Sequence, residues 1–581
     1  MKKLVLLGFT IITAVACNMD FYRSDVMTSN MLAENPGAAV YTTDGIYSLF
    51  KDSEEYRGKT IDGCEYVRHY FQMTEFRGDN VCLSGETSDP LCQEIRLNDF
   101  GSQKNIYYTW WCAYKIIYAA NSNIEALEKV SEPSTMESQM LGENYFFRAL
   151  GHFQLMTIFA PQYSLGTDNL GVVIRTSTDC SDTKRSKVGE VYEQIVADFK
   201  KAAELMKDDA NCRGDHGFVS FNAARGMLTR VYLTMGKYQE CLDLCNEMLG
   251  TNPAANLNPD LSDLYVNART SKETLWCIAH TMTDNQQRGS IGSMYFSTNG
   301  TGGTGWGEMY WADPLIELFL RYPGDKRFDA HFTQYGKLND GKKMIHWPLK
   351  GDNDFRDNAT VFDLTPDGAG NYTFSYQGAN YTATLKSKPE VNNGYPQYFI
   401  NFGGQETQVF VRDNTDKVSG IRFTFPQYYM SKYSWQDNEP MLSSPIVIRW
   451  GEIVLNRAEA EAKLGKTEDA IKDVNVIRHR AGIHEWANFA ECQTHNYSEV
   501  LDVVLDERRM ELCFEGQRAY DLIRNNKPID RRFAGIQPWE VVQPNDNRLP
   551  YQLPDDEILV SGIEQNPRLL FFYYYICSLT L

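Results

Sequence analysis

The residues with the clearest catalytic potential are the carboxylates of the segment 504–524, which reads VLDERRMELCFEGQRAYDLIR. At helical spacing, one stripe carries Glu507, Glu511, Glu515 and Arg518, and Asp521 and Arg524 continue around it. A glycosidase needs two carboxylates on opposite sides of the scissile bond, about 5–10 Å apart. Carboxylates four residues apart on one helix point the same way and cannot flank a bond. Interleaved arginines would also keep them ionised, so the pattern predicts a structural ion-pair network rather than a catalytic pair.

Other catalytic and metal-binding patterns are missing from the sequence. The nine histidines are dispersed, and neither HExxH, GxSxG nor CxxC occurs. The glycine-rich stretch 300–307 lacks the Gly-Lys-Ser/Thr of a phosphate-binding loop. The sequence therefore predicts a binding protein without a catalytic centre, a metal site or a cofactor.

Aromatic residues around this glycine-rich stretch form the first candidate binding site. They are Tyr295, Phe296, Trp306, Tyr310 and Trp311. Glycines let a backbone approach a ligand closely, and indole faces can stack on sugar rings. Asn299, Glu308 and Asp313 offer hydrogen-bond acceptors for hydroxyl groups. The alternative is that Tyr310 and Trp311 pack in the core ahead of a helix that begins near Asp313.

A second candidate site lies earlier, in the segment 70–80. Here Arg77, Asp79 and Asn80 combine hydrogen-bond donors and acceptors next to aromatic residues. The tripeptide Arg77-Gly78-Asp79 is interpreted as an ordinary turn rather than a recognition motif.

The first seventeen residues, MKKLVLLGFTIITAVAC, have the features of an export signal. Two lysines precede an apolar run that is too short to span a bilayer, which takes about twenty residues. Small residues then lead to Cys17, so residues 1–16 are predicted to be a signal peptide and Cys17 the site of lipid attachment. The alternative is an ordinary signal peptide followed by an incidental cysteine.

Composition narrows the range of partners. The chain has 581 residues and a net charge of −19, which disfavours binding to nucleic acid or to anionic lipid headgroups. It is rich in aromatic residues, with 34 Tyr, 30 Phe and 10 Trp. These properties favour a neutral ligand or a protein partner. The cysteines other than Cys17 are expected to be mostly reduced and buried.

Helical periodicity dominates both ends of the chain. Helices are expected over 110–130, 141–159 and 188–206. Residues 220–249 predict two helices broken at Met235-Gly236-Lys237, and residues 450–480 repeat this pattern around Gly465, with Thr467 capping the second helix. Such hairpins resemble tetratricopeptide repeats.

The region between these helical parts has a different character. Gly, Asn, Asp, Pro and aromatic residues dominate, and short runs such as those starting at Thr373 and Ile421 predict strands at most. The expected organisation is a helical region over 17–250, a loop-rich ligand-binding region over 251–445 and a second helical region over 446–581. The fold class is therefore mainly α, a tetratricopeptide-like scaffold with a large irregular insertion and short strands.

Several motifs resemble those of the SusD/RagB family of outer-membrane lipoproteins. They are Cys17, the helix from Trp111 to Ile124 with Asn121, the segments 144–150 and 451–460, the signature 506–518 followed by 521–524, and the closing segments 553–558 and 565–567. The resemblance covers nearly the whole chain. It departs at the end, where the apolar segment 568–581 replaces the family's short terminus.

This resemblance implies a function. Members of the family capture oligosaccharides, or sometimes peptides, at the cell surface and act as lids on a TonB-dependent transporter. The chain is therefore expected to be a glycan-binding lipoprotein, anchored in the outer membrane through Cys17 and facing the cell exterior, with a SusC-like transporter as partner. A peptide-capturing lipoprotein and a glycoside hydrolase are the alternatives.

Overall fold

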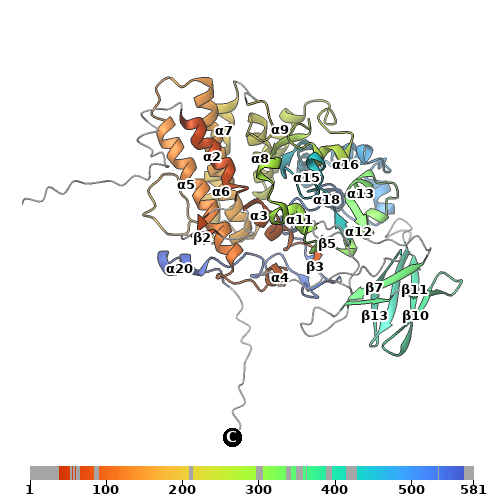
Figure 1. The fold of residues 1–581 in the computed structure, drawn as a ribbon. Helices are drawn as coiled ribbons and strands as arrows, with labels where there is room; N and C mark the ends of the chain where they lie inside the picture. The colour runs from red at the N-terminus through yellow and green to blue at the C-terminus, as the bar shows by residue number, and fades with distance from the viewer. Residues whose placement is uncertain are drawn as a thin grey trace, which may run out of the picture.

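The protein is described by a computed structural model, drawn in Figure 1. The described residues are 38–52, 55–56, 59–60, 66–83, 91–208, 213–295, 305–334, 342–348, 358–361, 363–387, 396–413, 428–533 and 535–567. Cys17 and the segment 568–581 lie outside them. Within the described residues, no helix is both long and apolar enough to cross a bilayer.

Long helices from the first part of the chain pack side by side at one end of the molecule (Figure 1). They are α2 (Ala39–Leu49), α5 (Lys104–Leu127), α6 (Thr135–Phe159) and α7 (Val188–Met206). Helix α6 is buried on nearly all sides because α5 and α7 flank it. Its start is fixed by a capping box in which Ser134 and Glu137 satisfy each other's backbone N–H groups.

Two helical hairpins confirm the tetratricopeptide-like pattern. They are formed by α8 (Phe221–Thr234) with α9 (Tyr238–Leu249), and by α15 (Trp450–Lys463) with α16 (Thr467–Ala481). Each turn contains a glycine with positive φ, 69° at Gly236 and 75° at Gly465. Helix α15 packs against both α9 and α16, so the two hairpins share one core. Thr467 begins α16, and the position before it, Lys466, is the N-cap.

The carboxylate-rich segment is not one continuous helix. Helix α18 (Val500–Glu511) ends at Glu511, and α19 (Arg518–Arg524) begins after a bend. Phe514 and Gly516 have positive φ values of 67° and 72° within this bend. The expected single helix over 504–524 is therefore wrong, because the chain turns between Glu511 and Arg518.

The middle of the chain holds more regular structure than its composition suggests. The strands β7 (Lys343–Pro348), β8 (Asn358–Val361), β9 (Thr365–Pro366), β10 (Tyr372–Tyr376), β11 (Ala379–Ser387), β12 (Pro396–Phe402) and β13 (Gln405–Asp413) form one antiparallel sheet. Its order is β8-β7-β13-β12-β11-β10-β9. Figure 1 shows this sheet projecting from the helical body. The run at Thr373 lies in β10 as predicted, whereas the run at Ile421 lies outside the described residues.

This sheet curls around a small core of its own. One face carries the buried side chains of Ile345, Phe374, Ala383, Ile400 and Val409, with partly buried tyrosines around them. Strand β8 approaches β10 although the two are not hydrogen-bonded neighbours, so the sheet closes over this face. Gln397 and Gln408, on the other face, donate hydrogen bonds to the two carboxylate oxygens of Glu317 at 3.0 and 3.1 Å and join the sheet to the body.

Shorter elements connect the helices and the sheet. The helices are α3 (Tyr66–Glu75), α4 (Leu91–Ile95), α10 (Leu261–Val266), α11 (Ile291–Tyr295), α12 (Asp313–Leu320), α13 (Lys326–His331), α17 (Phe489–Thr494) and α20 (Asp555–Ser561). The paired strands are β1 (Glu55–Tyr56) with β2 (Lys59–Thr60), β3 (Val81–Leu83) with β5 (Met309–Trp311), β4 (Thr274–Cys277) with β15 (Ile446–Arg449), β6 (Phe332–Gln334) with β14 (Tyr428–Met430), and β16 (Ile529–Asp530) with β17 (Val541–Val542).

The described cysteines are all free thiols, and all except Cys180 are buried. Cys241 and Cys245 share a face of α9 with their sulfur atoms 3.9 Å apart. Burial raises the pKa of Cys245, which favours the thiol over the reactive thiolate. The expectation of reduced, buried cysteines holds for these residues.

Gly142 tests the close contact of α6 with α7. A Cβ atom at this position would lie 2.6 Å from Cγ of Met206 and 3.1 Å from the backbone oxygen of Ala202. We expect Gly142→Ala to lower the free energy of unfolding by about 1–3 kcal/mol, because the helices must separate. Gly45 in α2 has open space around it, so Gly45→Ala should raise that free energy by about 0.5–1 kcal/mol. Urea unfolding followed by circular dichroism measures both, and equal effects would contradict the close contact.

Candidate ligand-binding site

Trp306 is held at the surface by its own backbone. The N–H groups of Trp306 and Gly307 both donate to the carbonyl oxygen of Ser293, at 2.7 and 2.9 Å. Gly305 and Gly307 have positive φ values of 72° and 53°, which glycine adopts without strain. The indole N–H donates to the carbonyl oxygen of Arg288 at 3.1 Å, while 48% of the side chain remains exposed. The result is an exposed indole with a fixed orientation.

Arg288, beside Trp306, and Trp435, in a neighbouring turn, were not predicted. The guanidinium of Arg288 lies 5.1 Å from the centroid of the indole ring, within cation–π range. Trp435 is 40% exposed in a neighbouring turn, where its φ of 72° is left-handed. That turn is close because the N–H of Gly305 lies 3.0 Å from the sulfur of Met441. No spacing in the sequence links Trp435 to Trp306, since more than a hundred residues separate them.

Three other aromatic residues expected around Trp306 are part of the core, and Phe296 lies outside the described residues. Tyr295, Tyr310 and Trp311 are 0%, 0% and 1% exposed. Trp311 packs edge-on against Phe514 at 5.0 Å, and Tyr310 packs against Tyr429 at 5.6 Å. Their expected contact with a ligand is corrected, because β5 lies in the interior beside β3 and Tyr295, at the end of α11, packs against Phe514. The alternative of core packing holds for them, while Asn299 lies outside the described residues.

Glu308 and Asp313, expected to accept hydroxyl hydrogen bonds, are also buried. They are 7% and 4% exposed. Both lie next to β5 in the sequence, and this strand, which contains Tyr310 and Trp311, is in the interior. The two carboxylates are therefore buried as well. Among the described residues that were expected in this site, Trp306 is therefore the one whose aromatic ring is exposed.

The second predicted site is a structural anchor. Arg77 is buried and pairs with Asp99 at 2.6 Å, with its guanidinium 3.5 Å from the ring centroid of Tyr551. Burial alone would raise the pKa of Asp79, but Arg509 and Arg518 lower it to about 2. The side-chain oxygen of Asn80 accepts a hydrogen bond from Arg509 at 2.8 Å. The expectation that Arg77, Asp79 and Asn80 contact a ligand is therefore corrected, since all three are buried and each pairs with a residue inside the protein.

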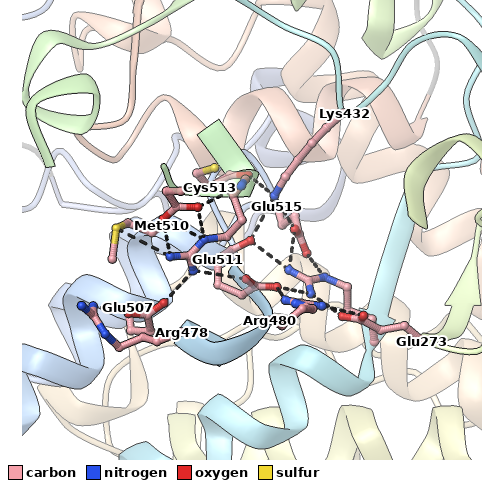
Figure 2. Close-up of polar contacts among 12 residues, drawn as sticks. Glu273, Lys432, Arg478, Arg480, Glu507, Met510, Glu511, Cys513 and Glu515 are labelled. Carbon is pink, nitrogen blue, oxygen red and sulfur yellow. Dashed lines mark hydrogen bonds and ion pairs between the residues drawn. The ribbon is translucent and has the colours of Figure 1, made fainter. Parts of the chain in front are cut away.

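The ion-pair network expected around Glu507, Glu511 and Glu515 is present and buried (Figure 2). Its acidic members are Glu273, Asp325, Glu507, Glu511 and Glu515, and its basic members are Arg327, Lys432, Arg449, Arg478 and Arg480. We call these ten residues the central network. Arg449 joins three of its carboxylates, at 2.8 Å to Glu273, 2.6 Å to Glu511 and 3.0 Å to Glu515.

Basic neighbours keep Glu511 and Glu515 charged. Burial alone would raise the pKa of Glu511, but Arg480, Arg449 and Arg327 hold it well below its ordinary value of 4.5. In the same way Arg449 and Lys432 lower the pKa of Glu515 to about 2. A general acid needs a carboxyl group that keeps its proton near neutral pH. These carboxylates therefore serve structure, as predicted. Their partners are basic residues from other segments, because the interleaved Arg508 pairs with Asp521, and Arg509 and Arg518 pair with Asp79.

Two carboxylates of α15, Glu452 and Glu459, also form buried ion pairs. Glu452 pairs with Arg230 at 2.6 Å, and Glu459 pairs with Arg524. Glu461 differs, because burial and the neighbouring Asp473 raise its pKa to about 8. Among the described residues, no group of His, Cys, Asp or Glu is arranged to hold a metal ion.

Comparison with known proteins identifies relatives over most of the chain. A family model described as "SusD family" matches residues 272–558, and one described as "Starch-binding associating with outer membrane" matches residues 73–233. A SusD-like protein of Formosa agariphila is 22% identical over 483 residues, which cover 80% of this chain and 81% of that protein.

Solved structures share the fold. A SusD superfamily protein from Bacteroides thetaiotaomicron has 21% identity and a TM-score of 0.65, covering 92% of this chain and 99% of its own. A protein from Bacteroides vulgatus described as a putative sugar binding protein has 22% identity and a TM-score of 0.64, covering 92% and 98%.

The central network gives a stability prediction. Glu511→Gln removes one charge and leaves three buried arginines around a neutral side chain, so we expect the free energy of unfolding to fall by about 3–5 kcal/mol. The control is Asp469→Asn, which breaks an exposed pair with Lys472 and should change it by less than about 1 kcal/mol. Urea unfolding at neutral pH measures both. A Glu511→Gln protein as stable as the control would show that the network adds little.

Glu75 gives a prediction for pH. Burial raises the pKa of this carboxyl group from 4.5 to about 8, although the N–H of Gly516 donates to one of its oxygens at 2.7 Å. Between these two pH values the folded state holds a proton that the unfolded state has lost, so stability decreases as the pH rises. Glu75→Gln should be as stable as the parent protein near pH 4.5 and more stable than it at or above about pH 8. Thermal unfolding over this range tests the crossover, and parallel curves would contradict the raised pKa.

Proposed function

Since the chain belongs to the SusD/RagB family, we propose that it is a cell-surface lipoprotein that captures oligosaccharides and passes them to a TonB-dependent outer-membrane transporter. The proposal draws on the relatives described as sugar-binding and on the family description that refers to starch binding at the outer membrane. It also draws on the surface around Trp306.

The observation that carries the proposal is the exposed, fixed indole of Trp306. An apolar ring face at the surface costs free energy unless a ligand covers it, and the C–H groups of a pyranose ring fit such a face. Its orientation is set by the hydrogen bonds to Ser293 and Arg288 before any ligand arrives. Less conformational entropy is then lost on binding. Arg288 offers a donor for sugar hydroxyl groups close to the ring.

The anchor of the proposed lipoprotein is Cys17. The evidence for it is the leader sequence, with its two lysines, short apolar run and small residues before the cysteine. Several acyl chains would hold the protein firmly, since each buried CH₂ contributes about 0.8 kcal/mol. A lipid tether on an acidic body of net charge −19 suits a protein that binds neutral ligands beside a membrane.

Binding rather than catalysis is the activity that we propose. The carboxylates that first suggested hydrolysis are paired with arginines in the central network. Capture of peptides is the alternative that the family resemblance leaves open, and a binding assay separates it from capture of glycans.

Trp306→Ala tests the proposed site. The chain from Asn18 onward is run through native gels that contain a neutral polysaccharide, over a panel of α- and β-linked glucans, mannans and xylans. We expect Trp306→Ala to lose most of the retardation of the parent protein, because stacking contributes most of the contact. The control is Trp539→Ala, which removes an indole that is 37% exposed elsewhere and should leave migration unchanged.

Two results would contradict the proposal. Retardation that is unchanged in Trp306→Ala would remove Trp306 from the site. Binding of oligopeptides, with no retardation by any polysaccharide of the panel, would favour the peptide-capturing alternative. Unfolding curves for both variants check that the fold is intact.

A further inference from the structure

A cavity of about 370 Å³ lies between α5, the segment 173–180 and α20, away from Trp306. Its volume is within the range of about 300–1,000 Å³ that is common for small-molecule sites. In Figure 1, α5 and α20 lie at the left of the molecule, whereas α11, next to the Trp306 turn, lies in the middle.

One wall of this cavity is a stripe of aromatic side chains on α5. The residues Tyr107, Trp111, Tyr114 and Tyr118 follow one another at intervals of four, three and four, so they share a helix face. They are half-buried, apart from Tyr118, which is 50% exposed. The opposite face of α5 carries Ile116 and Ile117, which are fully buried in the core. Tyr107, Trp111 and Tyr114 also pack in part against this core, and they line the cavity together with the exposed ring of Tyr118.

The second wall is fixed by hydrogen bonds from the same helix. The amide of Asn121 donates to the carbonyl oxygens of Arg175 and Ser177 at 3.1 and 3.0 Å. The hydroxyl of Tyr114 donates to the carbonyl oxygen of Val173 at 3.0 Å and accepts from its N–H at 3.1 Å. The wall is therefore preorganised, and its backbone groups are largely satisfied.

The third wall is α20, which places Asp556 and Glu557 at the cavity. This helix is held from its C-terminal side, where Arg185 donates to the carbonyl oxygen of Glu564 at 2.8 Å and to the side chain of Asn566 at 2.8 Å. Carboxylate acceptors thus lie across from the aromatic stripe.

Arg175 supplies the donor. Its backbone is held by Asn121 and His152, but its guanidinium makes no hydrogen bond or ion pair with any residue in the described part of the chain. A guanidinium at the mouth of a cavity can donate to two neighbouring hydroxyl groups at once. The cavity therefore combines flat apolar faces, a donor and acceptors.

We propose that this cavity is a second carbohydrate site, which takes a neutral sugar unit stacked on the α5 aromatic stripe. The identification of the ligand class rests on the proposed function. Carboxylates on α20 and the overall negative charge disfavour an anionic sugar, and Arg175 disfavours a cation beside it. A neutral ring uses its C–H faces on the tyrosines and tryptophan and its hydroxyl groups on Arg175 and Glu557. Two sites on one chain would let a long glycan bind with higher avidity than either site gives alone.

Cys180 provides a readout that reports on this cavity. It lines the cavity and is the exposed cysteine among the described ones. Its alkylation by iodoacetamide is followed by mass spectrometry of the peptide that contains it, in the chain from Asn18 onward. The probes are maltohexaose, cellohexaose, xylohexaose and mannohexaose, each at a concentration that saturates binding in calorimetry or at the solubility limit.

We expect at least one of these probes to slow alkylation of Cys180 by about fivefold or more. Arg175→Ala should raise the probe concentration needed for half-maximal protection about tenfold, because a charged hydrogen bond is lost. This variant should fold normally, since the guanidinium has no partner in the described structure. Tyr118→Ala should act in the same direction through lost stacking. Tyr41→Ala, which removes a tyrosine that is 76% exposed on α2, is the matched control and should change nothing.

The variants separate this proposal from the proposed function. Protection that persists in Trp306→Ala but weakens in Arg175→Ala supports the cavity whatever the role of Trp306. Binding that depends on Trp306, with alkylation of Cys180 unchanged by any probe, would overturn the cavity proposal and leave the proposed function intact. A failure of all probes to bind or to protect would also overturn it.

Discussion

The central network is the interaction on which the rest of the structure depends. Five carboxylates and five basic groups are buried together, and they come from α13, β15, α16, α18 and the segments that adjoin them. Burying so many charges is unfavourable unless each is paired, so the segments that carry them must meet in one arrangement. The bend between Glu511 and Arg518 allows this, because it turns Glu515 towards Lys432 and Arg449 while Glu511 faces Arg480. Charge pairing thus sets how the second half of the chain packs.

This arrangement decides which aromatic residues remain for a ligand. Phe514, in the bend of the network, packs against Trp311 and Tyr295 and fixes both in the core. Trp306 lies a few residues before β5, the buried strand that contains Trp311. It stays at the surface because the carbonyl oxygen of Ser293 holds its backbone there. On α5 the division runs along one helix, with isoleucines inside and an aromatic stripe at the cavity. The aromatic side chains available to a ligand, Trp306 and the stripe on α5, are therefore those that the core does not enclose.

Local patterns predicted the helices well and the site poorly. The hairpins around Gly236 and Gly465 follow from helical periodicity and a glycine that ends each first helix. The bend after Glu511 was missed because the charges continue at helical spacing across it. The curled sheet was missed because Gly, Asn, Asp and Pro are frequent in this region, which suggested loops. Asp79 and Asn80 seemed available for a ligand because their partners, Arg509 and Arg518, lie more than four hundred residues further along the chain. Arg77 seemed available because no local pattern pairs it with Asp99 or with Tyr551. The stripe at 107, 111, 114 and 118 was present in the sequence, and helical spacing alone could have identified it.

Glycan capture through exposed aromatic faces is the central claim, and a crystal structure with a bound oligosaccharide tests it most directly. The chain from Asn18 onward would be crystallised with the hexasaccharide that it binds most tightly. We expect a pyranose ring stacked on the indole of Trp306, with hydroxyl groups near Arg288. Sugar bound only at a surface without exposed aromatic rings, or the indole of Trp306 bare in a fully occupied complex, would contradict it.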